Sequence, residues 1–162
     1  MASLLQRAAR TGLAIARFLS PLAPLLTRLV IGVGFVLTGR GKLEHFDRTV
    51  SFFTDLQIPF PAANAAFVSR LEFYGGMFLV AGLLTRLIAL GLASSMVVAL
   101  LTADRAEFVK ALLLRGDAGL TDVASFVFLL FLLWLVLFGP GPLSLDRWLF
   151  SRLGSEEERK AG

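Results

Sequence analysis

Three ionisable side chains lie inside apolar segments of the sequence, where a charge is costly to keep. Arg28 interrupts LSPLAPLLTRLVIGVGFVLTG (19–39), and Arg70 and Glu72 interrupt AANAAFVSRLEFYGGMFLVAGLL (62–84). An unpaired charge at the centre of a membrane helix costs about 2.5 to 3.5 kcal/mol on insertion scales, so such residues need partners or a function. A buried guanidinium can donate hydrogen bonds to a ligand, and a buried carboxylate can accept them or hold a proton.

Helical geometry gives the two charges of the second segment different directions. Arg70 and Glu72 are two residues apart, so they point to nearly opposite sides of a helix and cannot pair with each other. Arg70 lies about 12 Å from the nearer helix end, a depth from which its long side chain reaches water. Glu72 is shorter and about 15 Å deep, so we expect it to face the interior of a bundle.

Arg28 is expected at the same depth as Glu72. The first segment runs outward and the second returns, and Arg28 precedes Gly39 by eleven residues, which places it about 16 Å below the same membrane face. The sequence therefore predicts an Arg28–Glu72 ion pair between the first two spans. From the residues alone, this pair either binds a ligand or only holds two helices together.

Small residues follow both charges at helical spacing. Gly32 and Gly39 share the face of the arginine, and Gly75 and Gly76 follow the glutamate by three and four residues. Small side chains on facing helices allow the backbones to approach closely. We therefore expect the first two spans to pack tightly along these faces.

Two further ionisable residues are open to a structural and a functional interpretation. Asp122 follows Thr121 at the expected start of the last span, where an acid caps the helix and complements its dipole. His45 is the only histidine and lies in a polar connection, where it either has no chemical role or relays protons or contacts a headgroup.

The composition is that of a polytopic membrane protein. Of the 162 residues, 56% are hydrophobic and 17% are charged, and the mean hydropathy is +0.76. The net charge is +4, but the basic residues are scattered at the ends of apolar runs, which argues against nucleic-acid binding. Without cysteine and with one histidine, no metal, haem or iron–sulfur cluster is expected, so electrons would come through a bound small molecule or a partner.

The expected fold is all-α, a membrane-spanning four-helix bundle. The spans are predicted at residues 19–39, 62–84, 87–103 and 120–139, the second and third forming a tight antiparallel hairpin. Short interfacial helices are expected at the N-terminus, in the first long connection and at the C-terminus. Residues 1–150 form one domain in this interpretation, and the polar tail 151–162 is expected to be disordered.

The distribution of basic residues predicts the orientation. Eight Lys and Arg lie in the N-terminal segment, the hairpin and the C-terminal segment, against six in the other two connections. This bias places both termini in the cytoplasm. A cleaved targeting peptide at the N-terminus is the less favoured alternative, since the following apolar run is long and contains Arg28.

Three blocks of the chain resemble the DoxX family of small four-helix membrane proteins. They are RLVIGVGFVLTGRGKLEHF (28–46), LEFYGGMFLVAGLLTRLIALGL (71–92) and GPGPLSLD (139–146). The resemblance implies a bacterial inner-membrane protein, related to the small subunit of a thiosulfate:quinone oxidoreductase and to members of other membrane oxidoreductase assemblies.

The resemblance also singles out residues by position. The membrane arginine of the family falls on Arg28, its Lys-Leu pair on Lys42 and Leu43, its acid on Glu72 with Gly75 and Gly76 after it, and its Thr-Arg on Thr85 and Arg86. Where many members have a Gly and a Glu at the start of the last helix, this chain has GLTD, with the shorter carboxylate of Asp122.

Two functions follow as hypotheses. The first is a quinone-interacting accessory subunit of a membrane oxidoreductase system, in which Arg28 donates to a quinone carbonyl, Glu72 handles the proton and a partner subunit supplies electrons. The second is a non-catalytic membrane anchor, chaperone or small-ligand binding protein whose buried charges are structural. A small-solute transporter is less favoured, because four helices without a repeat leave little room for alternating access unless the chain forms a homo-oligomer.

Overall fold

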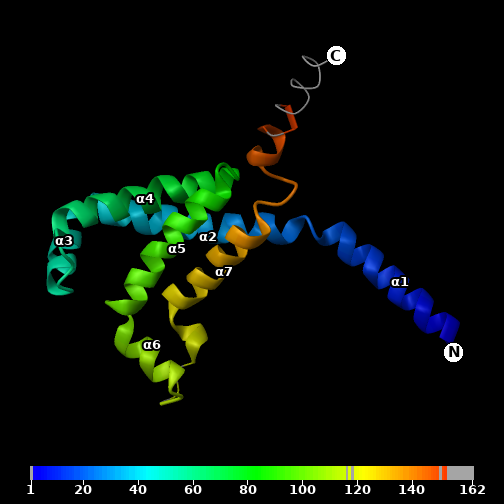
Figure 1. Ribbon diagram of the computed structural model, residues 1–162, viewed down its shortest axis with the longest axis horizontal. Helices are drawn as coiled ribbons and strands as arrows, with labels where there is room; N and C mark the ends of the chain where they lie inside the picture. Colours follow the sequence, from blue (N-terminus) through cyan, green and yellow to red (C-terminus); the bar gives the residue numbers. More distant parts are fainter. Residues whose placement is uncertain (1, 116, 118, 150, 153–162) are drawn as a thin grey trace.

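The computed structural model describes residues 2–115, 117, 119–149 and 151–152, and all regular elements in this part of the chain are helical (Figure 1). The elements, in chain order, are α1 (Ala2–Leu19), α2 (Leu22–Glu44), α3 (Phe46–Asp55), α4 (Pro61–Ala81), α5 (Thr85–Leu101), α6 (Arg105–Leu112), the 3-10 helix η1 (Leu120–Asp122) and α7 (Ala124–Phe138). Residues 145–149 add a last helical turn.

Four helices form the body of the molecule. α2 packs along α4, α5 packs along α7, and the short turn at residues 82–84 joins α4 to α5 as an antiparallel hairpin. The core between them is built from Ile31, Phe35, Leu79, Leu92 and Leu132. The prediction of a helical hairpin in the middle of the chain is therefore confirmed.

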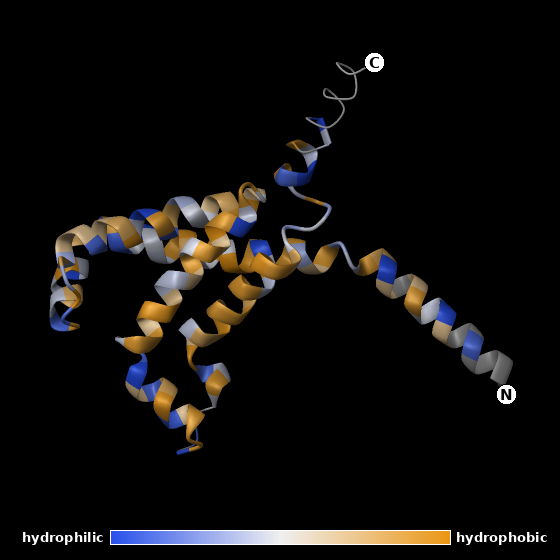
Figure 2. Ribbon diagram, in the orientation of Figure 1, coloured by the Kyte–Doolittle hydropathy of each residue, from blue (hydrophilic) through white to orange (hydrophobic). Residues whose placement is uncertain are grey.

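Apolar residues also cover the outside of these helices. Leu37 and Leu137 expose 63% and 72% of their surface, and α7 carries no charged residue (Figure 2). A helix that is apolar on all sides is either enclosed in a large core or surrounded by lipid. In a chain of 162 residues with this much outward-facing apolar surface, lipid is the consistent environment.

The four body helices lie where the sequence predicts the four spans, with ends that differ by up to five residues. By length and apolar composition, α2 qualifies alone as a membrane-crossing helix among the described residues, and α5 qualifies together with α6 across a bend of 82°. α7 is apolar but has 15 residues. The structure thus supports a membrane-associated helical protein, while four complete crossings remain a prediction.

Glycines set the contact between α2 and α4, as predicted. A Cβ atom at Gly76 would lie 2.6 Å from the carbonyl oxygen of Gly32 and 2.7 Å from the amide nitrogen of Val36. A Cβ at Gly39 would lie 2.8 Å from the Cα of Phe73. No side chain fits at these positions, so the two backbones touch.

The three short helices expected outside the bundle are all present. α1 points away from the body (Figure 1), and its described side chains are exposed. α3 follows α2 directly, and Ser144 caps the C-terminal turn by accepting a hydrogen bond from the Arg147 amide at 3.3 Å. Their position at a membrane surface remains a prediction, and the tail residues 153–162 lie outside the described residues.

One short helix was not predicted. α6 occupies the connection between the third and fourth spans, and Asp104 before it accepts a hydrogen bond from the Ser125 hydroxyl at 2.5 Å. This contact ties the α5–α6 bend to the first turn of α7.

Candidate functional site

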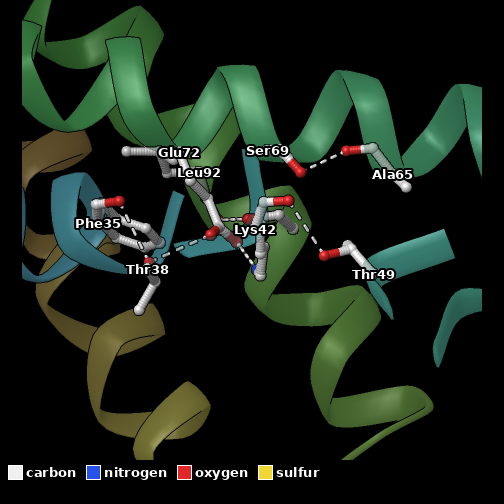
Figure 3. Close-up of polar contacts among 9 residues, drawn as sticks. Phe35, Thr38, Lys42, Thr49, Ala65, Ser69, Glu72 and Leu92 are labelled. Atoms are coloured by element: carbon white, nitrogen blue, oxygen red, sulfur yellow. Dashed lines mark hydrogen bonds and ion pairs between the residues drawn. The ribbon is translucent and has the colours of Figure 1, made fainter. Parts of the chain in front are cut away.

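A buried carboxylate and an ammonium group form an ion pair between α2 and α4. Lys42 Nζ donates to Glu72 Oε1 at 2.5 Å, and the Thr38 hydroxyl lies 3.2 Å from Glu72 Oε2 (Figure 3). The Glu72 side chain is 2% exposed and the Lys42 side chain 33% exposed. The carboxylate is therefore held inside the protein, and the ammonium group bridges it to a more open space.

The local helix geometry explains the position of Lys42. α2 continues to Glu44, so Lys42 is helical and lies one turn after Thr38, on the side that faces α4. The hydroxyl of Thr49 on α3 is 3.2 Å from the Lys42 carbonyl oxygen. This contact joins the end of α2 to α3.

The predicted Arg28–Glu72 ion pair is wrong. Glu72 pairs with Lys42, and the Arg28 guanidinium instead donates to the carbonyl oxygen of Leu143. The antiparallel register of α2 and α4 explains this. Gly39 packs against Phe73, the neighbour of Glu72, whereas Arg28 lies beside Gly82, ten residues further along α4 and its following turn.

The error came from the position assumed for the end of the first helix. The sequence interpretation ended it at Gly39, but α2 runs five residues further, which adds about 7.5 Å. Measured from Glu44, Arg28 is about 24 Å along the helix, and Glu72 is about 16 Å from the start of α4 at Pro61. The two charges therefore lie at different levels.

Arg28 belongs to a junction at the other end of the α2–α4 pair. It is 1% exposed, and its Nε and Nη1 atoms have no hydrogen-bond partner among the described residues. Next to it, the Asp146 carboxylate accepts hydrogen bonds from the amides of Leu84 and Thr85 at 2.7 and 2.9 Å. The Asp146 amide donates to the Gly82 carbonyl at 2.9 Å. The junction thus fastens the segment after α7 to the α4–α5 turn.

A cavity of about 470 Å³ opens beside the Lys42–Glu72 pair. Its walls come from α3, the α3–α4 loop, α4 and α5, and most of them are apolar. The residues that line it are Lys42, Phe52, Phe53, Leu56, Gln57, Ile58, Pro59, Asn64, Phe67, Val68, Leu71, Glu72, Ser94, Ser95, Met96, Val98, Ala99, Thr102 and Ala103. Lys42 and Glu72 are the only charged residues in this set, so this ion pair supplies the charge that borders the cavity.

The remaining predicted site residues lie elsewhere. Gly76 packs against α2, and Gly75 packs against Ile88 and Leu92 of α5. Asp122 accepts a hydrogen bond from the Gly119 amide at 2.7 Å and caps η1, directly before α7. None of these three residues lines the cavity.

His45 and Arg70 are also outside the cavity. His45 is exposed between α2 and α3, where its carbonyl oxygen accepts a hydrogen bond from the Thr49 amide at 3.1 Å. Arg70 is exposed on the opposite side of α4 from Glu72, with its guanidinium 3.1 Å from the Ala66 carbonyl oxygen. The prediction that Glu72 faces the interior, on the opposite side of the helix from Arg70, is confirmed.

Sequence reasoning missed Lys42 as the partner of Glu72, although the helical pattern contained a signal. Lys42 follows Arg28 by 14 residues, close to four full turns, so both lie on the face that carries Gly32 and Gly39. Extending the first helix by one turn would have brought Lys42 into consideration. The aromatic cavity wall has a weaker signal in the paired Phe52 and Phe53, which lie in the first long connection, where the sequence predicts an interfacial helix.

No group of three or more His, Cys, Asp or Glu side chains suited to a metal ion occurs among the described residues. Beside the cavity the site offers one ammonium group, one carboxylate and a neighbouring hydroxyl. Such a set can donate hydrogen bonds to a carbonyl oxygen and hold a proton.

Comparisons with known proteins agree with the resemblance of the sequence blocks. The DoxX family model matches residues 23–105, about half of the chain. A protein of Bacillus subtilis (strain 168) named "Putative oxidoreductase CatD" is 28% identical over 127 residues, which cover 78% of this chain and 86% of that protein. No solved structure matches with comparable significance.

Proposed function

The chain belongs to the DoxX family, and we propose that it is a quinone-interacting accessory subunit of a membrane oxidoreductase system. One observation carries the proposal: the Lys42–Glu72 ion pair supplies the charged side chains of a cavity whose lining is mostly apolar and partly aromatic. The name of the Bacillus relative, an oxidoreductase, fits the same class of activity.

The cavity fits the ring of a quinone in size and chemistry. Its volume of about 470 Å³ lies within the range of about 300 to 1,000 Å³ that is typical of small-molecule sites. Phe52, Phe53 and Phe67 supply flat apolar surface, which suits an aromatic ring. A quinone needs such a surface together with a few hydrogen-bond donors for its carbonyl oxygens.

Lys42 is the residue best placed to donate to a ligand. An ammonium group has three N–H donors, and one of them is used by Glu72. The remaining donors are available to a carbonyl oxygen, because one third of the side chain is exposed. Arg28, which the sequence interpretation gave this role, does not line the cavity.

Glu72 is suited to hold or release a proton next to the ligand. Oε1 accepts from Lys42, and the hydroxyl of Thr38 is within hydrogen-bond distance of Oε2. These contacts fix the carboxylate in one orientation at the cavity edge. A bound quinone would supply the capacity to take up two electrons and two protons, and a partner subunit would supply the electrons.

The setting proposed for this site is the bacterial inner membrane. Apolar outer surfaces on α2, α5 and α7 suit lipid contact. The proposal includes a multi-pass topology with both termini in the cytoplasm, following the bias of basic residues.

A purely structural role for the ion pair is the competing function. Gly39 packs directly against Phe73, the neighbour of Glu72, so the pair lies where α2 and α4 are in closest contact. In this alternative Lys42 and Glu72 fix the register of two helices in a non-catalytic membrane anchor, chaperone or small-ligand binding protein.

Quinone analysis of the purified protein separates the two functions. The protein is purified from its native membrane, and the organic extract is analysed for quinone by chromatography. We expect quinone in the wild-type extract and a loss of about tenfold or more in Lys42→Met, since a hydrogen bond from a charged donor contributes about 1.5 to 3 kcal/mol. Lys110→Met is the matched control, because Lys110 is exposed on α6 and outside the cavity.

The double variant Lys42→Met/Glu72→Leu distinguishes the proposed function from the structural alternative. It removes both charges without leaving one unpaired, so the helices are expected to stay packed. Absence of quinone from the wild-type extract, or unchanged quinone content in this well-folded double variant, would refute the proposed function.

A further inference from the structure

A second cavity, of about 540 Å³, lies at the opposite end of the α4–α5 hairpin from the Lys42–Glu72 site. The start of α5 and the segment that leaves α7 form its walls, and Figure 1 shows this segment passing the α4–α5 turn. Its charged residues are Arg86, Asp146 and Arg147. It shares no lining residue with the first cavity.

The negative charge in this cavity is already engaged by backbone amides. Asp146 accepts hydrogen bonds from the amides of Leu84 and Thr85. Arg86 and Arg147 are exposed, and neither forms an ion pair with another residue in the part of the chain that the structure describes. The cavity therefore has an excess of positive charge.

A buried hydroxyl without a partner lies in the same wall. Thr85 is fully buried, and its Oγ1 atom has no hydrogen-bond partner among the described residues. A buried polar atom without a partner costs about 1 to 3 kcal/mol, so a hydrogen-bond partner for this hydroxyl would be stabilising. The amides of Arg86 and Leu87 add donors, because first-turn amides of a helix have no acceptor within it.

The guanidinium of Arg86 lies across the backbone of the segment after α7. A Cβ atom at Gly139 would be 3.3 Å from both Nε and Nη2 of Arg86, and Gly139 has a positive φ of 80°. Arg86 therefore packs against the backbone at Gly139, where an added side chain would crowd its guanidinium.

Apolar side chains continue from the cavity onto the outer surface. Leu84, Leu87 and Phe138 line it and are each more than half exposed. Trp148 is nearby in the chain, and the Arg152 guanidinium lies 4.2 Å from the centre of its ring. Exposed tryptophan and arginine side chains beside apolar surface are typical of the membrane–water boundary.

We propose that this cavity binds the phosphate group of an anionic phospholipid. Arg86 and Arg147 contact the phosphate, and an acyl chain lies along Leu87 and Phe138. The Thr85 hydroxyl and the amides of Arg86 and Leu87 donate hydrogen bonds to the phosphate. Basic pockets between membrane helices bind lipid headgroups in this way. The apolar rim favours a lipid over a free phosphate ion, which would gain nothing from it.

Native mass spectrometry of the full-length protein in a neutral detergent tests the proposal. Phosphatidylglycerol and phosphatidylcholine are titrated separately, and retained lipid is counted. We expect one tightly retained phosphatidylglycerol and weaker retention of phosphatidylcholine. An arginine near an anionic lipid contributes about fivefold in affinity, so Arg86→Gln/Arg147→Gln is expected to weaken retention about 25-fold.

Two matched double variants separate a site from diffuse attraction. Arg105→Gln/Arg115→Gln removes the same charge from the α6 end and should retain the lipid. Arg86→Lys/Arg147→Lys keeps the charge and should restore most of the retention, which also shows that the altered cavity folds. Equal weakening by both glutamine pairs, or equal retention of both lipids by the wild type, would overturn the proposal.

Two further experiments test whether the ligand is a lipid and where its phosphate group binds. Inorganic phosphate alone should neither bind with the same arginine dependence nor displace phosphatidylglycerol, and either result would replace the lipid with a free phosphate ion. Thr85→Val keeps the shape of the side chain and removes its hydroxyl. Unchanged retention in this variant would overturn the placement of the phosphate at the start of α5.

Discussion

The contact between α2 and α4 can be tested with one methyl group. In Gly39→Ala the new Cβ would lie 2.8 Å from the Cα of Phe73 and 2.9 Å from the carbonyl carbon of Glu72. Both atoms belong to the backbone of α4, which cannot rotate away as a side chain can. The Phe73 amide nitrogen would lie closer still, so the two helices must separate by more than the 0.6 Å that restores a 3.4 Å contact with the Phe73 Cα.

The matched control lies two residues further along the same helix. A Cβ at Gly41 would meet nothing within 4 Å, so Gly41→Ala gains only the helix preference of alanine, about 0.5 to 1 kcal/mol. Gly39→Ala gains the same amount but suffers overpacking of about 1 to 3 kcal/mol. The two variants should therefore differ by about 1 to 3 kcal/mol in the free energy of unfolding.

Thermal unfolding of the purified variants measures this difference. For a chain of this size, 1 kcal/mol corresponds to a shift of about 2 to 4 °C in the midpoint. We expect Gly39→Ala to unfold about 2 to 12 °C below Gly41→Ala. The separation would also lengthen the 3.2 Å contact between Thr38 and Glu72, so ligand retention should fall in Gly39→Ala alone. Equal midpoints would refute the close approach of the helices and the position it gives to Glu72.

Substitutions at three polar contacts test them individually, each measured as a change in unfolding midpoint. Lys42→Met should lower the free energy of unfolding by about 2 to 3 kcal/mol, because it leaves a carboxylate that is 2% exposed without its partner. Glu72→Leu should lower it by about 1 kcal/mol or less, because the remaining ammonium group reaches water. Equal losses in the two variants would contradict the burial of Glu72. Asp146→Ala removes the acceptor of two amides at the start of α5 and should cost about 1 to 2 kcal/mol, whereas Asp146→Asn should cost less. Ser125→Ala should cost about 1 kcal/mol by freeing Asp104, and no change would show that the α5–α6 bend does not depend on this bond.

The sequence predicted the helices well because their signal is local. Apolar runs bounded by charges and prolines fix where a helix begins and ends to within a few residues. The glycine faces of α2 and α4 were also predictable, since Gly32, Gly39 and Gly76 recur at helical spacing next to large apolar residues. These features need no knowledge of which helix neighbours which.

The ion-pair partner of Glu72 could not be predicted in the same way. Pairing across two antiparallel helices depends on their relative register, and an error of five residues at one helix end moves a side chain by about 7.5 Å. The predicted first span ends at Gly39, because charged residues usually end a span, so Lys42 falls in the polar connection that follows it. Here Gly39 allows α4 to approach so closely that the helix and its lysine continue along the buried face.

The cavity was beyond sequence reasoning because its walls come from four separate segments. Phe53 on α3, Phe67 on α4 and Met96 on α5 meet around it, and no local pattern relates their positions. What the sequence does contain is a cluster of aromatic residues just after the first span. Their assignment to a membrane surface placed them near the correct end of the bundle, without indicating an enclosed space.

One face of α2 carries two cations, Arg28 and Lys42, whose different surroundings indicate different roles. Arg28 and Lys42 lie about 21 Å apart along the helix, and the returning α4–α5 hairpin gives each a different neighbour. Arg28 is 1% exposed and donates to the carbonyl oxygen of Leu143 at the junction with Asp146. This contact stabilises the packing of the segment after α7 against α2. Lys42 is one third exposed and borders a cavity. Of the two cations, Lys42 alone borders the cavity, so substitutions at Arg28 should change stability only, whereas those at Lys42 should change ligand binding in addition to stability.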